Sequence, residues 1–151
     1  MLQVARVLLT ITAIQYGIMP LFADLSETNV FHADWPPHAR FHMVWLLGFG
    51  LSLAAYVMAL VWFPSRNRLP NLWQASLLGF LPLLGFFAAF LSLDSYDGSL
   101  SAIVGREPRF GLEGNLISFS IAFVLQTIAL IIVWRRQSVD QESPVDSRLQ
   151  S

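Results

Sequence analysis

The stretch from Phe41 to Phe63 reads FHMVWLLGFGLSLAAYVMALVWF and contains no aspartate, glutamate, lysine or arginine. About 20 such residues form a helix long enough to cross the roughly 30 Å hydrocarbon core of a bilayer. Three further apolar stretches have similar lengths, and they occupy Leu2–Phe22, Leu72–Leu93 and Asn115–Trp134. The sequence therefore predicts an all-α fold over residues 1–136, a four-helix transmembrane bundle with up-down topology. Residues 137–151 are polar and are predicted to be a disordered cytoplasmic tail.

The composition agrees with a lipid environment. Of the 151 residues, 55% are hydrophobic and 13% are charged, whereas a soluble domain carries about 25% charged residues. The net charge of −1 provides no basic surface for nucleic acid. The chain has no cysteine, which excludes disulfides and thiolate metal sites. The predicted partner is the lipid bilayer. No cofactor is predicted, although a metal ion is compatible with the histidines, and homo- or hetero-oligomers are left open.

The distribution of arginine predicts the orientation, because cytoplasmic segments carry an excess of basic residues. The ends of the four spans separate the nine arginines into two groups. One side has Arg6, Arg66, Arg68, Arg135, Arg136 and Arg148, and the other has Arg40, Arg106 and Arg109. Both termini are therefore expected to be cytoplasmic, and the first span is expected to be retained rather than cleaved as a signal peptide.

Within the spans, small residues four positions apart predict helix-packing seams, because small side chains let helices approach closely in lipid. The three pairs are Gly48 with Ser52, Gly50 with Ala54, and Ala75 with Gly79. Pro82 and Gly85 predict a kink in the third span.

No ionisable residue lies in the middle of any span, which argues against an ion-coupled transporter or a voltage sensor. The deeper polar residues are neutral amides and hydroxyls, and we expect them to form interhelical hydrogen bonds. They are Gln15, Tyr16, Gln126 and Thr127.

All three histidines fall within one short segment, FHADWPPHARFH, which spans residues 31–42. Asp34 is suited to cap the second span, with Pro36 and Pro37 in its first turn, so this helix is expected to begin near Trp35. His38 and His42 are four residues apart and share a helix face.

Trp45 continues that face by one turn, and we expect both imidazoles to point into the bundle. Arg40 lies about 200° from His38 on the helix, and it is expected to reach a lipid phosphate or a carboxylate.

This histidine segment has three interpretations. Interfacial histidine, tryptophan and arginine can simply anchor a helix at the membrane surface. The same residues can line a site for a small ligand, with His38 and His42 in hydrogen-bonding or acid–base roles. A metal site is the third interpretation, with His32, His38 and His42 as its ligands. The acidic residues Asp94 and Glu113 are expected on the same side of the membrane and could complete either kind of site.

The string Trp35-Pro36-Pro37-His38-Ala39-Arg40-Phe41-His42 resembles the hallmark of an uncharacterised family of small four-span membrane proteins. This resemblance implies the fold and the importance of His38, Arg40 and His42, without implying a reaction. The overall plan, with Ala23-Asp24-Leu25 after the first span, is also similar to that of the emopamil-binding and sterol isomerase superfamily, which implies a sterol-like ligand.

The main functional hypothesis is a polar site that binds or transforms a small lipophilic molecule, such as an isoprenoid, sterol-like or quinone-like compound. His38 and His42 are its candidate catalytic residues. Its candidate ligand-binding residues are Arg40, Tyr16, Trp45, Asp94 and Glu113. A structural or accessory membrane subunit without catalysis and a histidine-based metalloprotein are the alternatives, and the sequence does not decide whether the protein is an enzyme.

Overall fold

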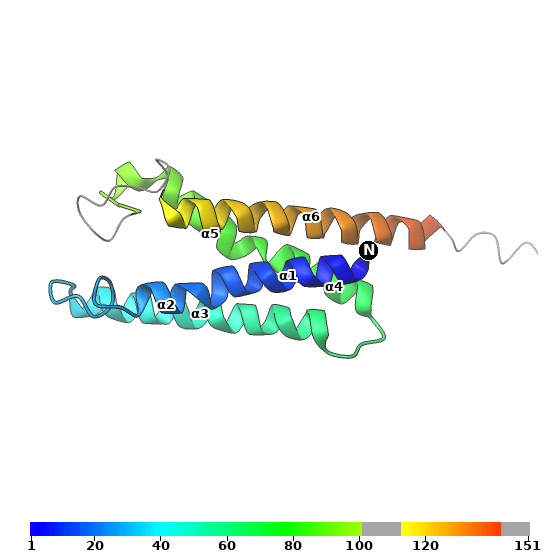
Figure 1. The fold of residues 1–151 in the computed structure, drawn as a ribbon, viewed down its shortest axis with the longest axis horizontal. Helices are drawn as coiled ribbons and strands as arrows, with labels where there is room; N and C mark the ends of the chain where they lie inside the picture. The colour runs from blue at the N-terminus through cyan, green and yellow to red at the C-terminus, as the bar shows by residue number, and fades with distance from the viewer. Residues whose placement is uncertain (101–112, 143–151) are drawn as a thin grey trace, which may run out of the picture.

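A computed structural model describes residues 1–100 and 113–142, except for the side chains of 140–142. Helices make up most of these residues (Figure 1). No strand occurs in these residues. The elements are α1 (Leu2–Gly17), α2 (Met19–Asp24), α3 (Pro37–Trp62), α4 (Arg68–Leu78), α5 (Phe80–Leu91), the short 3-10 helix η1 (Leu93–Ser95) and α6 (Gly114–Glu142).

In the described part of the chain, four helical stretches are long and apolar enough to cross a membrane, if α1 is joined with α2 and α4 with α5. They cover Leu2–Asp24, Pro37–Trp62, Arg68–Leu91 and Gly114–Val139. The predicted all-α four-helix architecture is thus confirmed, and each span has shifted or lengthened by a few residues. Helix α6 continues to Glu142, so the first residues of the predicted tail are helical. Arg106, Arg109 and Arg148 lie outside the described residues.

The first and third spans are each interrupted just before a proline. Helix α1 ends at Gly17 before Pro20, and α4 ends at Leu78 before Pro82. A proline lacks an N–H group, and its ring collides with the carbonyl four residues earlier. In the third span the interruption at Gly79 comes three residues before Pro82, which accounts for the break. The predicted kink is therefore present, and it is located at Gly79.

Successive spans run in opposite directions, and the bundle has two distinct ends (Figure 1). At the end that we call the arginine end, the N-terminus lies beside the residues that link α3 to α4 and the last turns of α6. At the opposite end, called the histidine end, residues 25–36 link α2 to α3, and the chain passes from α5 through η1 towards α6.

The packing is closer at the arginine end than at the histidine end. Helix α1 packs against both α3 and α6, and α4 packs against the same two helices. Helix α5 packs against α6 and has no comparable contact with α3, and Figure 1 shows α5 and α3 diverging. Leu83 is the only buried residue of α5, α2 has none, and the first buried residue of α3 is Leu47. The histidine end of the bundle thus leaves most of its apolar side chains on the surface.

A buried amide joins three helices at the centre of the bundle. Gln126 of α6 is fully buried, and its Oε1 accepts a 2.6 Å hydrogen bond from the hydroxyl of Thr12 in α1. Its Nε2 donates a 2.7 Å hydrogen bond to the backbone carbonyl of Ser76 in α4. In hydrocarbon a polar group without a partner costs several kcal/mol. The expected interhelical role of Gln126 is therefore confirmed, and it ties α1, α4 and α6 together.

Gly79 makes room for this amide. A Cβ atom at position 79 would collide with Nε2, Cδ and Oε1 of Gln126. The seam predicted from Ala75 and Gly79 therefore receives a glutamine side chain from α6. Because Gln126 is held by hydrogen bonds at both ends of its amide, it cannot easily move away from an added methyl group.

A second close contact joins α1 to α3. A Cβ atom at Gly17 would collide with the side chain of Ala54 and lie 3.1 Å from the carbonyl oxygen of Gly50. The seam predicted from Gly50 and Ala54 is therefore confirmed, with Gly17 as its partner. The pair Gly48 and Ser52 is exposed instead, and nothing lies within 4 Å of a Cβ atom placed at Gly48.

At the arginine end, one cation closes the contact between α1 and α3. The guanidinium of Arg6 donates from Nε to the carbonyl of Val61 at 3.0 Å and lies 4.2 Å from the ring centroid of Trp62. The indole N–H of Trp62 donates in turn to the hydroxyl of Thr10. Arg6 thus binds one of the last carbonyls of α3, which have no partner within the helix.

Replacement of Gln126 tests the central amide. We expect Gln126→Leu, which keeps the side-chain volume and removes the amide, to lower the free energy of unfolding by about 1–2 kcal/mol. The matched control is Thr127→Val, because among the described residues the Thr127 hydroxyl bonds only to the carbonyl of Phe123 in its own helix. Denaturant titration in detergent micelles measures both variants, and equal losses would contradict a special role for Gln126.

Two glycines in the broken span give a second comparison. We expect Gly79→Ala to lower the free energy of unfolding by about 1–3 kcal/mol, because the added methyl group has no free space. Gly85→Ala adds the same methyl group where nothing lies within 4 Å, and removal of a helical glycine should stabilise by up to about 1 kcal/mol. Opposite signs in the same unfolding assay are the expected result, and a neutral Gly79→Ala would show that the amide can shift.

Candidate functional site

The link between α2 and α3 is a compact loop with its own hydrogen bonds. The side-chain amide of Asn29 donates to Oδ1 of Asp24 at 2.8 Å, and the backbone N–H of Val30 donates to the carbonyl of Asp24 at 3.0 Å. The N–H of Phe31 donates to the carbonyl of Ser26 at 3.0 Å. Val30 is buried at 4% exposure. The loop therefore holds a defined shape up to the histidine segment.

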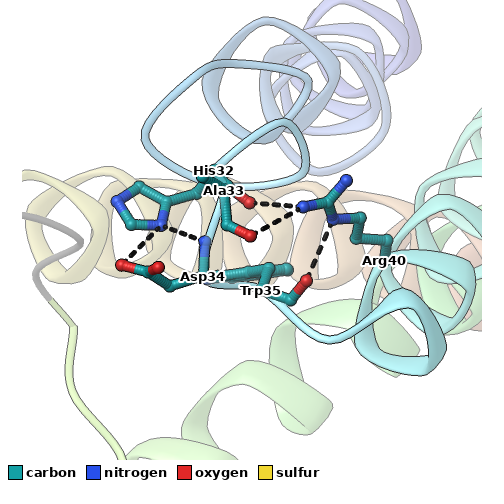
Figure 2. Close-up of polar contacts among 5 residues, drawn as sticks. All are labelled: His32, Ala33, Asp34, Trp35 and Arg40. Carbon is teal, nitrogen blue, oxygen red and sulfur yellow. Dashed lines mark hydrogen bonds and ion pairs between the residues drawn. The ribbon is translucent and has the colours of Figure 1, made fainter.

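Arg40 fastens the end of this loop to α3 (Figure 2). Its Nη2 donates to the carbonyl oxygens of His32 at 2.7 Å and Ala33 at 3.2 Å, and its Nε donates to that of Trp35 at 3.1 Å. The sequence did not predict this clamp, because a lipid phosphate or a carboxylate was the expected partner of Arg40. The 200° separation from His38 was the available signal, because it pointed Arg40 away from the histidine face.

Helix α3 begins at Pro37, two residues later than expected. Pro36 is its N-cap residue, in an extended conformation with φ −60° and ψ 142°, and no side chain caps the helix. A residue that precedes a proline is disfavoured in helical conformation, so Pro37 prevents Pro36 from joining the helix. Asp34 therefore is not the cap. Its backbone N–H donates instead to Nδ1 of His32 at 3.3 Å, and its carboxylate lies 4.0 Å from the same nitrogen (Figure 2).

His38 and His42 form a direct pair on the first turns of α3. Their Nε2 atoms are 3.0 Å apart, the ring centroids are 4.4 Å apart, and the ring planes cross at 87°. Both side chains are exposed, so the expectation that they point into the bundle is wrong. The reason is that the first buried residue of α3 is Leu47, so the turns that carry the two histidines have no buried face.

Aromatic side chains border the histidine pair. The ring centroid of His42 lies 5.7 Å from that of Phe41 and 5.9 Å from that of Trp45. Phe41 is 65% exposed and Trp45 is 64% exposed. The face of α3 at this end therefore changes from two imidazoles to an apolar aromatic surface within about one helical turn.

The other candidate residues lie apart from this pair. Asp94 is in η1 and is exposed, and Glu113 is half-buried just before α6. Tyr16 is buried within the bundle at 4% exposure, and its hydroxyl has no hydrogen-bond partner among the described residues. No described hydrogen bond, ion pair or ring contact joins any of the three to His38 or His42.

The three histidines do not converge. His32 belongs to the loop and interacts with Asp34, whereas His38 and His42 interact with each other. Among the side chains that the structure describes, in residues 1–100 and 113–139, no group of three or more histidine, aspartate or glutamate residues is arranged to hold a metal ion. Of the three histidines, only His38 and His42 therefore contact each other.

The comparisons with known proteins concern this same part of the chain. No curated protein and no solved structure shows significant similarity to it. Residues 8–101, more than half of the chain, match a family of unknown function, DUF6640, and the match includes the loop, the arginine clamp and the histidine pair. The chain therefore belongs to the DUF6640 family of unknown function.

Proposed function

We propose that this membrane protein binds a small lipophilic molecule at its histidine end, with the polar end of that molecule held by His38 and His42. The observation that carries the proposal is the contact between these two imidazoles beside exposed aromatic side chains. Binding is the proposed function, and acid–base chemistry on the bound molecule would be a second function of the same two histidines.

The chemistry of a neutral imidazole pair suits the polar end of such a molecule. When the Nε2–H of one ring donates to Nε2 of the other, the donor ring keeps Nδ1 as an acceptor. The acceptor ring must then carry its hydrogen on Nδ1 and presents it as a donor. In either direction the pair offers one donor and one acceptor, which matches a hydroxyl group. The same chain of nitrogens can pass a proton, which is the basis for general acid–base catalysis.

The apolar part of the ligand would lie on the neighbouring surface. Phe41 and Trp45 continue from the pair along α3, and α5 diverges from α3 because the third span is broken at Gly79. A lipophilic molecule can reach such a surface sideways from the bilayer, without passing through water. Binding sites for small molecules typically combine an apolar lining with a few polar groups in this way.

The remaining candidate residues receive secondary roles in this proposal. Arg40 uses Nε and Nη2 for the loop, and Nη1 is left to approach an anionic group of the ligand. Asp94 and Glu113 flank the histidine end from η1 and the start of α6. The buried hydroxyl of Tyr16 would meet a polar group that enters more deeply.

The choice of ligand class rests on resemblance. The string from Trp35 to His42 is proposed to be a hallmark of the family, and the plan similar to the emopamil-binding and sterol isomerase superfamily favours a sterol-like compound. Isoprenoid and quinone-like compounds share the required chemistry, which is a long apolar body with one polar end.

We also propose that both termini are cytoplasmic. The arginine end has Arg6, Arg66, Arg68, Arg135 and Arg136, whereas Arg40 is engaged at the histidine end. The excess of basic residues marks the cytoplasmic side. The histidine pair would then lie at the opposite surface of the membrane.

Retention of a ligand through purification tests the binding proposal. We expect native mass spectrometry of the detergent-purified protein, in buffer with a metal chelator, to show an organic species that the His38→Ala/His42→Ala variant loses. His32→Ala is the matched control, because it removes an imidazole from the same end and leaves the pair intact. Farnesol, cholesterol and a short-chain quinone added to the purified protein then test the three classes through the change in tryptophan fluorescence.

The contrary outcomes are distinct. If the double variant folds normally and keeps the organic species, the pair is not its binding site. If no organic species or added probe binds, and the double variant instead loses a co-purifying protein, the histidine end is a docking surface of an accessory subunit.

Single cysteines test the orientation without background, because the natural chain has none. We expect Glu27→Cys, in the loop before α3, to react with a membrane-impermeant maleimide added to intact cells. Ser65→Cys, in the link between α3 and α4, should react only after the membrane is permeabilised. The reverse pattern would place the termini outside the cytoplasm.

A further inference from the structure

The two rings of the histidine pair are nearly perpendicular and bring their Nε2 atoms close together. In an end-to-end N–H···N bond, both ring radii would add to the separation of the nitrogens, and the centroids would be much farther apart than the nitrogens. Here the Nε2 atoms are 3.0 Å apart and the centroids are only 4.4 Å apart. The two nitrogens therefore do not lie on the line that joins the ring centres, and an ion beside the pair can come within reach of both.

We propose that His38 and His42 chelate one divalent transition-metal ion through their Nε2 atoms. Histidine nitrogens bind zinc at about 2.0–2.1 Å. Two nitrogens 3.0 Å apart can both reach one ion at that distance. The spacing of four residues on α3 puts the two rings on successive turns of a single helix, so the helix backbone keeps both within reach of one ion.

The surroundings of the pair suit a cation with open coordination positions. Arg40, the nearest arginine in sequence, is turned to the loop carbonyls and does not place its charge at the pair. No third protein ligand from the described residues converges on the pair. Water or a bound molecule would fill the remaining positions, as in metal sites that act on substrates. Imidazole ligands favour copper, zinc and nickel over magnesium or calcium, and copper binds most tightly in the divalent series.

This proposal depends only on the pair and not on the lipophilic ligand. Its test therefore uses the metal ion alone. The full chain is purified in detergent without a polyhistidine tag and is titrated with Cu²⁺. Quenching of tryptophan fluorescence reports binding, since Trp45 lies beside His42. Electron paramagnetic resonance of the Cu²⁺ complex reports how many nitrogens coordinate the ion.

Four variants distinguish chelation from binding by separate surface histidines. We expect His38→Ala and His42→Ala each to weaken Cu²⁺ binding by about tenfold or more, because a second ligand on the same scaffold multiplies affinity. His32→Ala should bind as the wild type does. The variant His42→Ala/Met43→His keeps three histidines, but the two on α3 are then five positions apart instead of four. It should bind Cu²⁺ as weakly as His42→Ala.

The wild type should bind one Cu²⁺ per chain with two coordinating nitrogens in the resonance spectrum. If the His42→Ala/Met43→His variant binds Cu²⁺ as tightly as the wild type, the proposal is overturned. The same holds if His32→Ala weakens Cu²⁺ binding as much as His38→Ala or His42→Ala does. Single variants that bind half as many ions with unchanged affinity would show two independent histidines. Thermal unfolding of each variant in the same detergent verifies that a loss of binding is not a loss of fold.

Discussion

The buried amide of Gln126 is the interaction on which the rest of the bundle depends. Lipid provides no hydrophobic driving force for helix association, so close packing and shared hydrogen bonds must hold the helices together. Gln126 meets this requirement with a bond to Thr12 on one side and a bond to the Ser76 carbonyl on the other. Because α6, α1 and α4 all converge on one side chain, their relative rotation and depth are set at that level of the membrane.

The two halves of the bundle differ on either side of the level at which Gln126 lies. The amide occupies the space beside Gly79, and the third span breaks there because Pro82 has no N–H group to donate to the carbonyl of Leu78. Helix α4 stays with α3 on one side of the break, whereas α5 follows α6 on the other. The half towards the arginine end is therefore a closed bundle, and the histidine end has a face of α3 with few protein partners.

Much of the fold could be predicted from the sequence, because the length of an apolar run and the position of prolines act locally. The interhelical role of Gln126 was also predictable, since a lone amide in hydrocarbon needs a partner. The direction of the histidines was not. In a membrane helix the lipid-facing and protein-facing sides are equally apolar, so periodicity does not show which face of α3 is packed. The Gly48 and Ser52 pair misled for the same reason.

The direction of Arg40 could be predicted from its helical position, but its hydrogen-bond partners could not, and they change how the histidine segment is understood. Its partners are backbone carbonyls, which any sequence provides, and their positions depend on the loop being folded. Once the clamp is in place, it lies on one side of the first turns of α3, and His38 and His42 lie on another. A helix start without a side-chain cap would otherwise fray. Arg40 thus ties the loop to the helix start through the face opposite the imidazoles, so that the pair remains exposed while the turns that carry it are held in place.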